Sequence, residues 1–581
     1  MKIVTGKSIS PGYAQGHAMT LGIEQPGITR TQIQPDEIES ELERFHSALE
    51  ESYRELTQLQ ARVQSEIGSE SADIFSAHLL FLQDKQFIDK VEASVRNDHL
   101  GLESAIQVTI DELARLLIEA DSAFMRERAA DVRDLQRRLL RHITSSSAQQ
   151  LAKLEPGSIL VARELLPSDL LEFDREHLVG IITETGGETG HAAILARALG
   201  IPAVTGITDA MRIIKPGMPA LIDGQTGEVI LEPAPERLRA SMHNRQNYER
   251  ISQNAIDAED CECITLDGVK VQLFANVGRP YEASQVAEHH LEGVGLFRTE
   301  YLFLDEPVAP SFERQREIYC QVAASLQGLP LIIRTLDLGG DKWPAFLKPR
   351  FEANPNLGVR GLRFSLLAAE QLFRDQIRAT LHAAIQHDVQ IMLPMVLGVA
   401  DLQHALSIIQ DVAEKEGLPE LPPIGTVIET PAAVFTIEEI LAASDFVSIG
   451  TNDLTQFMLA ADRNALAMID DYTVLHPSVL RAVHRIIEAA DAVGKPVSVC
   501  GEAAADPRVA CLLIGLGVRR LSMSPVSAAR VRYAVRASYQ SSLESLAQAA
   551  LRSDSAQTVS TLVTDALRTT YPNFHGNITS V

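Results

Sequence analysis

The second half of the chain alternates short apolar segments with helical stretches, and this alternation constrains the fold more than any other feature. From about residue 262 onward the apolar segments are VQLFANV, GVGLFRTE, LIIRTLD, QIMLPMV, IGTVIET, FVSIGTND, VSVCGEA and RRLSMSP. Each is short enough for a buried parallel strand, and each is followed by a stretch with helical character. Eight such units over about 300 residues predict a (β/α)8 TIM barrel, which we place at 261–581.

The first half of the chain has two different textures. Residues 1–34 and 146–232 carry short β-rich runs broken by Gly and Pro, which predicts a compact α/β domain. Residues 35–145 contain almost no Gly or Pro, and apolar residues recur at three- and four-residue spacing, as in Phe75, Leu79 and Leu82. The sequence therefore predicts a helical bundle inserted in the α/β domain, with a polar linker helix at 233–260 leading to the barrel.

Composition narrows the class of partner and the compartment. The 581 residues include 52 Lys and Arg against 77 Asp and Glu, a net charge of −25 that repels nucleic-acid phosphates. No apolar run is long enough to span a bilayer, and the start of the chain does not resemble a secretory signal. The 5 cysteines form neither a disulfide framework nor a zinc-finger pattern. We expect a cytoplasmic protein that binds neither nucleic acid nor membrane.

Charged and polar residues gather where the predicted barrel strands end. They are Arg298, Glu300, Arg334, Asp337, Glu429, Asn452, Asp453, Cys500 and Glu502. In a TIM barrel these carboxyl ends form the active-site face. Ordinary ion pairs at strand ends are the alternative, and they explain any one of these residues better than they explain the whole set.

These residue types point to a class of ligand. A guanidinium grips carboxylate and phosphate with two hydrogen bonds and stays charged, so several arginines suit a multiply charged anion. Glu429 and Asp453 offer the oxygen ligands that Mg²⁺ prefers. A phosphorylated carboxylic acid fits both groups.

The segment TGGETGHAAILARALGIPAVTG, residues 185–206, places a histidine before a strong helix-forming run. His191 is therefore expected at a helix N-terminus, where free amides and the helix dipole favour a neutral imidazole and stabilise an added phosphate. A capping or core role is more common for a lone histidine near a helix start. Spacing alone leaves both interpretations open.

Many ordered motifs resemble one family. GGETGHAAILARALGIPAV is similar to the phosphohistidine signature of phosphoenolpyruvate-utilising enzymes, and nearly the whole chain resembles Enzyme I of the bacterial phosphotransferase system. The other matching segments are SPGYAQG, RERAADVRDLQRRLL, GVGLFRTEYLF, RTLDLGGDK, NPNLGVRGLR, IETPAA, SIGTNDLTQFMLAADR, HPSVL, CGEAA and LSMSPVS. The resemblance implies that the α/β domain is a phosphohistidine domain and that the barrel binds phosphoenolpyruvate.

The resemblance also implies individual roles. His191 is implied as the phosphorylated nucleophile and Cys500 as the acid that protonates the enolate of pyruvate. Glu429 and Asp453 are implied as Mg²⁺ ligands. The implied substrate contacts are Arg298, Arg334, Lys342, Arg360, Asn452, Asp453 and Arg463. This chain departs from the family signature at two positions: Glu188 stands where a basic residue is usual, and Gly190 where a serine is usual. These departures bear on which carrier protein accepts the phosphate more than on the use of phosphoenolpyruvate as the donor.

Partners follow from the same resemblance. The helical insertion would dock the carrier protein HPr, the barrel would form a homodimer, and the reaction would be the first step of sugar uptake. Candidate docking residues are Phe75, His78, Leu79, Phe81, Leu82 and Asp84, although the helical spacing equally allows Phe75, Leu79 and Leu82 to be bundle core.

Alternative functions stay in view. A nitrogen-type regulatory branch with a different HPr-like carrier is the alternative pathway. Phosphoenolpyruvate synthase and pyruvate phosphate dikinase would need a nucleotide-binding domain, and no glycine-rich phosphate loop precedes His191. A degenerate regulatory binding module would have lost the nucleophile or the metal ligands, yet His191, Glu429, Asp453 and Cys500 are all present.

Overall fold

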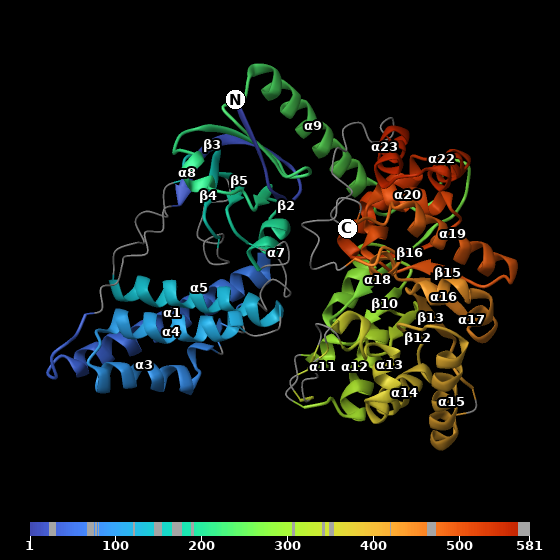
Figure 1. The fold of residues 1–581 in the computed structure, drawn as a ribbon, viewed down its shortest axis with the longest axis horizontal. Helices are drawn as coiled ribbons and strands as arrows, with labels where there is room; N and C mark the ends of the chain where they lie inside the picture. Colours follow the sequence, from blue (N-terminus) through green and yellow to red (C-terminus); the bar gives the residue numbers. More distant parts are fainter. Residues whose placement is uncertain are drawn as a thin grey trace. The chain divides into compact units, whose positions relative to one another are not determined.

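The chain folds into two compact units, Met1–Tyr248 and Glu249–Val581, shown in Figure 1. The structure is a computed structural model. It describes residues 1–21, 31–66, 75, 78–79, 81–119, 123–144, 154–165, 177–186, 191–304, 308–339, 343–344, 346–347, 352, 354–418, 420–461 and 472–567. Each unit is described by itself.

The first unit is built on an eight-stranded mixed sheet in the part that the structure describes. Its strands, in spatial order, are β1 (Lys2–Thr5), β8 (Glu228–Leu231), β7 (Pro219–Asp223), β3 (Tyr13–Leu21), β4 (Ser158–Ala162), β5 (Leu178–Thr183), β6 (Ala203–Thr205) and β2 (Lys7–Ser10). The central strands from β3 to β6 run parallel, and antiparallel strands pair on both sides of them. β4 is SILVA, and all of its residues are buried, as expected of a parallel strand covered on both faces.

A helical bundle interrupts this sheet between β3 and β4, as the low Gly and Pro content predicts. Its helices are α1 (Ile38–Glu66), α3 (Lys85–Asp98), α4 (Leu102–Glu119) and α5 (Ala123–Thr144). The apolar positions of α5 at helical spacing, Val132, Leu135 and Leu139, are buried against the other helices. The shorter helices of the unit are α7 (His191–Ala198) and α8 (Ala210–Ile213).

The candidate docking residues lie mostly in the bundle core. Phe75, His78 and Leu82 are at most 4% exposed, so the interpretation of these three as exposed docking contacts is wrong. Leu79 and Phe81 are partly buried and pack against the same core. Asp84 is exposed and caps α3 by accepting a hydrogen bond from the backbone amide of Gln86 at 2.8 Å. A helical period identifies an apolar face without showing whether another helix covers it.

The second unit contains the predicted barrel. Eight parallel strands close on themselves in the order β10-β11-β12-β13-β14-β15-β16-β9. They are β9 (Gln272–Val277), β10 (Val294–Arg298), β11 (Leu331–Arg334), β12 (Val389–Leu393), β13 (Ile424–Ile428), β14 (Phe446–Ile449), β15 (Val497–Val499) and β16 (Arg520–Met523). Seven of these strands lie within the apolar segments read from the sequence, and β12 begins one residue before its segment, at Val389. The multidomain α/β fold ending in a TIM barrel is therefore confirmed.

Helices surround the barrel (Figure 1). They are α10 (Gln285–Glu288), α11 (Tyr301–Leu304), α12 (Phe312–Ser325), α13 (Leu362–Leu367), α14 (Glu370–Ala384), α15 (Val399–Glu416), α16 (Pro431–Phe435), α17 (Ile437–Ala443), α18 (Thr451–Met458), α19 (Pro477–Ala492), α20 (Pro507–Gly515), α21 (Ala528–Arg536), α22 (Gln540–Arg552) and α23 (Ala556–Leu567). Local signals set their ends: Asp506 caps α20 just before Pro507, and α15 ends at Gly417 with φ of 68°. None of the described helices is long and apolar enough to cross a membrane.

Helix α9 (Pro235–Asp257) joins the two units in sequence, and its C-terminal end is fixed to the barrel. Asn254 donates a hydrogen bond to the Tyr533 hydroxyl at 3.2 Å. Just beyond the helix, buried Arg532 donates to the Glu259 carbonyl oxygen at 2.8 Å. The domain limits drawn from the sequence stay predictions.

Candidate active site

The carboxyl ends of the barrel strands bring most of the predicted site residues into one buried region. Arg298 ends β10 and Arg334 ends β11. Glu429 follows β13, Asp453 lies in the first turn of α18 after β14, and Cys500 follows β15. Lys342 and Arg463 lie outside the described residues.

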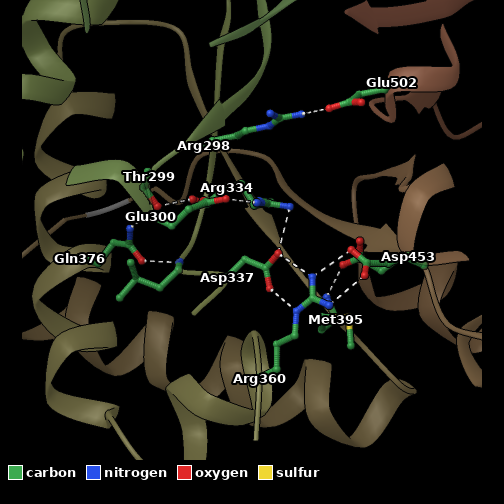
Figure 2. A network of polar contacts seen from close by, with 12 residues as sticks. Arg298, Thr299, Glu300, Arg334, Asp337, Arg360, Gln376, Met395, Asp453 and Glu502 are labelled. Atoms are coloured by element: carbon green, nitrogen blue, oxygen red, sulfur yellow. Dashed lines mark hydrogen bonds and ion pairs between the residues drawn. The ribbon is translucent and has the colours of Figure 1, made fainter. Parts of the chain in front are cut away.

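A chain of ion pairs crosses this region, which we call the barrel mouth, and Figure 2 shows it from close by. Arg334 Nη2 donates to Glu300 Oε1 at 2.6 Å, and Arg334 Nη1 lies 3.3 Å from Asp337 Oδ2. Arg360 donates to both oxygens of Asp337 at 3.2 Å and to both oxygens of Asp453 at 2.8 and 2.9 Å. Burial opposes the charge of Arg360, but Asp337 and Asp453 outweigh it and raise the pKa of the guanidinium.

Uncharged side chains fix the positions of the residues in this series of ion pairs. The Thr299 hydroxyl donates to the Arg334 carbonyl oxygen at 2.7 Å, and Gln376 Nε2 donates to the Thr299 hydroxyl at 2.9 Å. The other end of the Gln376 amide accepts a hydrogen bond from the Leu336 amide at 2.9 Å. Gln376 is fully buried, so the backbone from the Arg334 carbonyl to the Leu336 amide is tied to helix α14, directly at Leu336 and through Thr299 at Arg334 (Figure 2). Sequence reasoning missed Gln376, because nothing in its own helix sets it apart.

Glu429 lies in the mouth with one oxygen fixed by backbone. Its Oε1 accepts a hydrogen bond from the Met395 amide at 2.7 Å. A Cβ atom at Gly450 would lie 2.5 Å from Glu429 Oε2, so only glycine leaves room for this carboxylate. Burial and the neighbouring carboxylates Asp453 and Asp337 raise the pKa of Glu429 to about 8.

The described mouth brings buried carboxylates and buried arginines together. Glu300, Asp337, Glu429 and Asp453 are buried carboxylates, and the described mouth opposes them with the two buried arginines Arg334 and Arg360. Burial is the main cause of the raised pKa of Glu429 and the neighbouring carboxylates add to it, and a divalent cation with oxygen ligands would lower this pKa. The described residues contain no group of three or more His, Cys, Asp or Glu arranged around a metal position. The carboxylate oxygens of Glu429 and Asp453 are nevertheless of the type that a divalent cation such as Mg²⁺ prefers.

More exposed residues form the rim of the mouth. Arg298 Nη2 lies 4.0 Å from Glu502 Oε1, and the Glu502 side chain is 64% exposed. The Glu502 amide donates to Asn452 Oδ1 at 3.3 Å. Arg298 and Asn452 are therefore positioned at the solvent side of the buried ion pairs.

Cys500 is 5% exposed and packs with apolar side chains from four other strands. These side chains are Leu296, Met392, Val427 and Phe446. The thiol lies 3.7 Å from the Ile449 carbonyl oxygen, to which it donates. Burial raises the pKa of Cys500, so the thiol stays protonated at neutral pH. This environment suits both a proton donor and a small core residue.

Three family models together match most of the chain. The phosphoenolpyruvate-binding domain of phosphoenolpyruvate-utilising enzymes matches residues 252–540, the N-terminal domain matches 5–128, and the mobile domain matches 154–227. Proteins named phosphoenolpyruvate-protein phosphotransferase from Staphylococcus epidermidis and Listeria monocytogenes are 34% and 35% identical over 97% of this chain and 99% of their own. A Staphylococcus aureus protein of the same name is 34% identical over 95% of this chain and 97% of its own. The chain belongs to the phosphoenolpyruvate-protein phosphotransferase family.

His191 lies in the segment that matches the mobile-domain model of this family. Helix α7 begins at His191, which is the helix start expected from the sequence. The position of its side chain is outside what the structure describes, as are Glu188 and Gly190. His191 belongs to the first unit, whereas the mouth belongs to the second.

Two glutamates of the mouth differ in burial, and this difference gives a prediction about stability. Glu300→Gln leaves the buried Arg334 without its closest carboxylate, so the free energy of unfolding of the barrel unit falls by about 3 kcal/mol. The matched Glu502→Gln acts on an exposed pair and costs well under about 1 kcal/mol. Urea unfolding of the two variants and the unchanged chain measures both effects. Equal costs would show that the Glu300 pair is not held in a low-dielectric environment.

Proposed function

We propose that this chain transfers the phosphoryl group of phosphoenolpyruvate to His191 and then to a histidine of an HPr-like carrier protein. The observation that carries the proposal is the buried mouth of arginines and carboxylates, in a chain whose relatives are named phosphoenolpyruvate-protein phosphotransferase. Phosphoryl transfer needs positioning and charge stabilisation more than covalent chemistry from the protein. A rigid charged mouth supplies both.

The arginines would bind the substrate and stabilise the group in transfer. The proposed substrate-binding arginines are Arg298 at the rim and Arg334 and Arg360 in the interior. A guanidinium stays protonated throughout the physiological pH range, so all three remain positively charged. Their planar donors match phosphate and carboxylate oxygens, and burial strengthens each contact. Asn452, Lys342 and Arg463 complete the proposed substrate contacts by family resemblance.

Mg²⁺ is the proposed cofactor, with Glu429 and Asp453 as its protein ligands. When bound, it would neutralise negative charge on the transferring phosphoryl group. The Met395 amide orients the Glu429 carboxylate through a hydrogen bond, and the missing side chain of Gly450 leaves room for it. The proximity of Glu429 to Asp453, which contributes to the raised pKa of Glu429, supports this assignment.

The chemistry divides between two residues. An imidazole nitrogen of His191 forms a bond to phosphorus while the bond from phosphorus to the enol oxygen breaks, which leaves the enolate of pyruvate. The Cys500 thiol then gives its proton to the methylene carbon, and pyruvate forms. Backbone amides at the start of α7 favour the phosphate that His191 has gained. Since His191 and the mouth belong to different units, the cycle requires the histidine to meet first the mouth and then the carrier.

Finer features of the proposal rest on the family. The carrier would dock on the helical bundle, the barrel would form a homodimer, and the protein would act in the cytoplasm at the first step of phosphotransferase sugar uptake. The buried positions of Phe75, His78 and Leu82 direct the search for carrier contacts to other residues of the bundle.

The nucleophile can be tested by labelling. His191→Ala should abolish acid-labile, base-stable labelling from radioactive phosphoenolpyruvate, because no other group in the proposal accepts the phosphoryl group. His243→Ala, which changes an exposed histidine of α9, should label like the unchanged chain. Full labelling of the His191 variant would refute the assignment.

The proton donor can be tested by comparing two buried cysteines. Cys500→Ser keeps size but offers a much weaker acid, so pyruvate formation should slow roughly 10²-fold while phosphoenolpyruvate still binds. Cys511, which is buried outside the mouth near Ser538, provides the control. Cys511→Ser should lower the melting temperature and spare turnover. Near-normal steady-state turnover of Cys500→Ser would remove Cys500 from the mechanism.

A further inference from the structure

Arg360 makes two forked contacts in the barrel mouth, one on each side of its guanidinium (Figure 2). Nη1 and Nη2 donate to the two oxygens of Asp453 at 2.8 and 2.9 Å. Nε and Nη2 donate to the two oxygens of Asp337 at 3.2 Å. Arg360 is therefore shared between two buried carboxylates that lie 116 residues apart in sequence (453 − 337).

The contact with Asp453 conflicts with the proposed role of that residue. A forked guanidinium engages both carboxylate oxygens, and its positive charge repels any other cation at the same carboxylate. Asp453 therefore cannot hold a divalent cation at full strength while Arg360 keeps this position. In the described arrangement, the guanidinium of Arg360 is bound at both oxygens of this carboxylate.

We propose that Arg360 competes with the divalent cation for Asp453, and that Asp337 is the positioning residue that retains Arg360 when it leaves Asp453. The inference rests on the proposed function, because that function supplies the cation. Asp337 is suited to this task because it is 2% exposed and already holds the other side of the same guanidinium. Arg360 can then give up one fork without becoming an isolated buried charge.

The surroundings of Asp337 make it a firm anchor. Its carboxylate also lies 3.3 Å from Arg334 Nη1, and it follows the β11 end that Thr299 and Gln376 tie down. A Cβ atom at Gly361 would lie 3.3 Å from Asp337 Oδ1 and 2.7 Å from the Met395 Cβ, so the backbone next to Arg360 passes close to this anchor. Gly361 also has φ of 58°, which favours glycine.

This exchange couples the cation to the phosphorylated substrate. A phosphate that draws Arg360 toward itself frees Asp453, and a cation at Asp453 frees Arg360 for the phosphate. Two ligands that favour the same state bind with positive coupling, and the coupling is reciprocal. The cation alone should therefore bind weakly, and substrate should tighten it.

Binding of Mn²⁺ without substrate tests the competition, with free Mn²⁺ measured by electron paramagnetic resonance. Arg360→Gln should tighten Mn²⁺ binding about tenfold, because the guanidinium of Arg360 no longer occupies both oxygens of Asp453. Arg360→Lys, which keeps one charge but cannot form two forks, should tighten it less and serves if the glutamine variant does not fold. Unchanged or weaker Mn²⁺ binding in the folded variants would overturn the proposal.

A double-mutant cycle tests whether Asp337 acts through Arg360. Asp337→Asn should weaken Mn²⁺ binding about tenfold in the unchanged chain, because Arg360 then has only Asp453 as its carboxylate. In the Arg360→Gln background the same change should cost less than about threefold. An equal loss in both backgrounds would mean that Asp337 acts only as a nearby charge, and this result would reject its positioning role.

The same variants separate this inference from the proposed function. Adding phosphoenolpyruvate to the His191→Ala chain, where no transfer follows, should tighten Mn²⁺ binding about tenfold or more, and Arg360→Gln should remove most of that gain. A gain that survives Arg360→Gln would overturn the coupling. Labelling of the unchanged chain by phosphoenolpyruvate tests the function itself, and its failure would leave the Mn²⁺ results without substrate interpretable.

Discussion

The candidate site depends on one electrostatic constraint: charges buried at the end of a closed barrel must be neutralised by other buried charges. Glu300, Arg334, Asp337, Arg360 and Asp453 satisfy it by forming a continuous chain in which each guanidinium contacts two carboxylates. Burying an ion without a partner of opposite charge destabilises the folded protein by several kcal/mol. Removing one of these side chains therefore leaves its neighbours as uncompensated buried charges. The positions of the arginines are thus set by carboxylates before any substrate arrives.

The barrel makes this arrangement possible. Eight parallel strands place their carboxyl ends in one ring, so residues far apart in sequence meet without long loops. The apolar layer of Leu296, Met392, Val427 and Phe446 lies under Cys500 and helps to exclude water from the interior. A dry interior strengthens the charge interactions above it, and it also raises the pKa of Glu429 and Cys500. Burial thus disfavours the charged form of both side chains. A bound cation would stabilise the carboxylate of Glu429, and the thiol of Cys500 stays protonated.

The sequence predicts the large features of this structure because they have a period or a fixed place in a motif. The eight strands follow from apolar runs, and the polar residues at their ends follow from barrel geometry. The partners of each charge could not be predicted, since the contact between Arg360 and Asp453 joins a loop to a helix across the mouth. Gln376 could not be predicted either, because its contacts with Leu336 and Thr299 also join residues that are far apart in sequence. In the bundle, the spacing of Phe75 and Leu82 identifies an apolar face but not what covers it.

Under the proposed function, the mouth requires a divalent cation before it can hold a multiply charged phosphorylated acid. The negative charge of the buried carboxylates Asp337 and Asp453 would otherwise oppose the binding of such an anion. Calorimetric titration of phosphoenolpyruvate into the His191→Ala chain, first with Mg²⁺ and then with EDTA in its place, measures this requirement directly. We expect binding with Mg²⁺ and a loss of affinity of roughly a hundredfold without it. Equal affinity under the two conditions would contradict the claim.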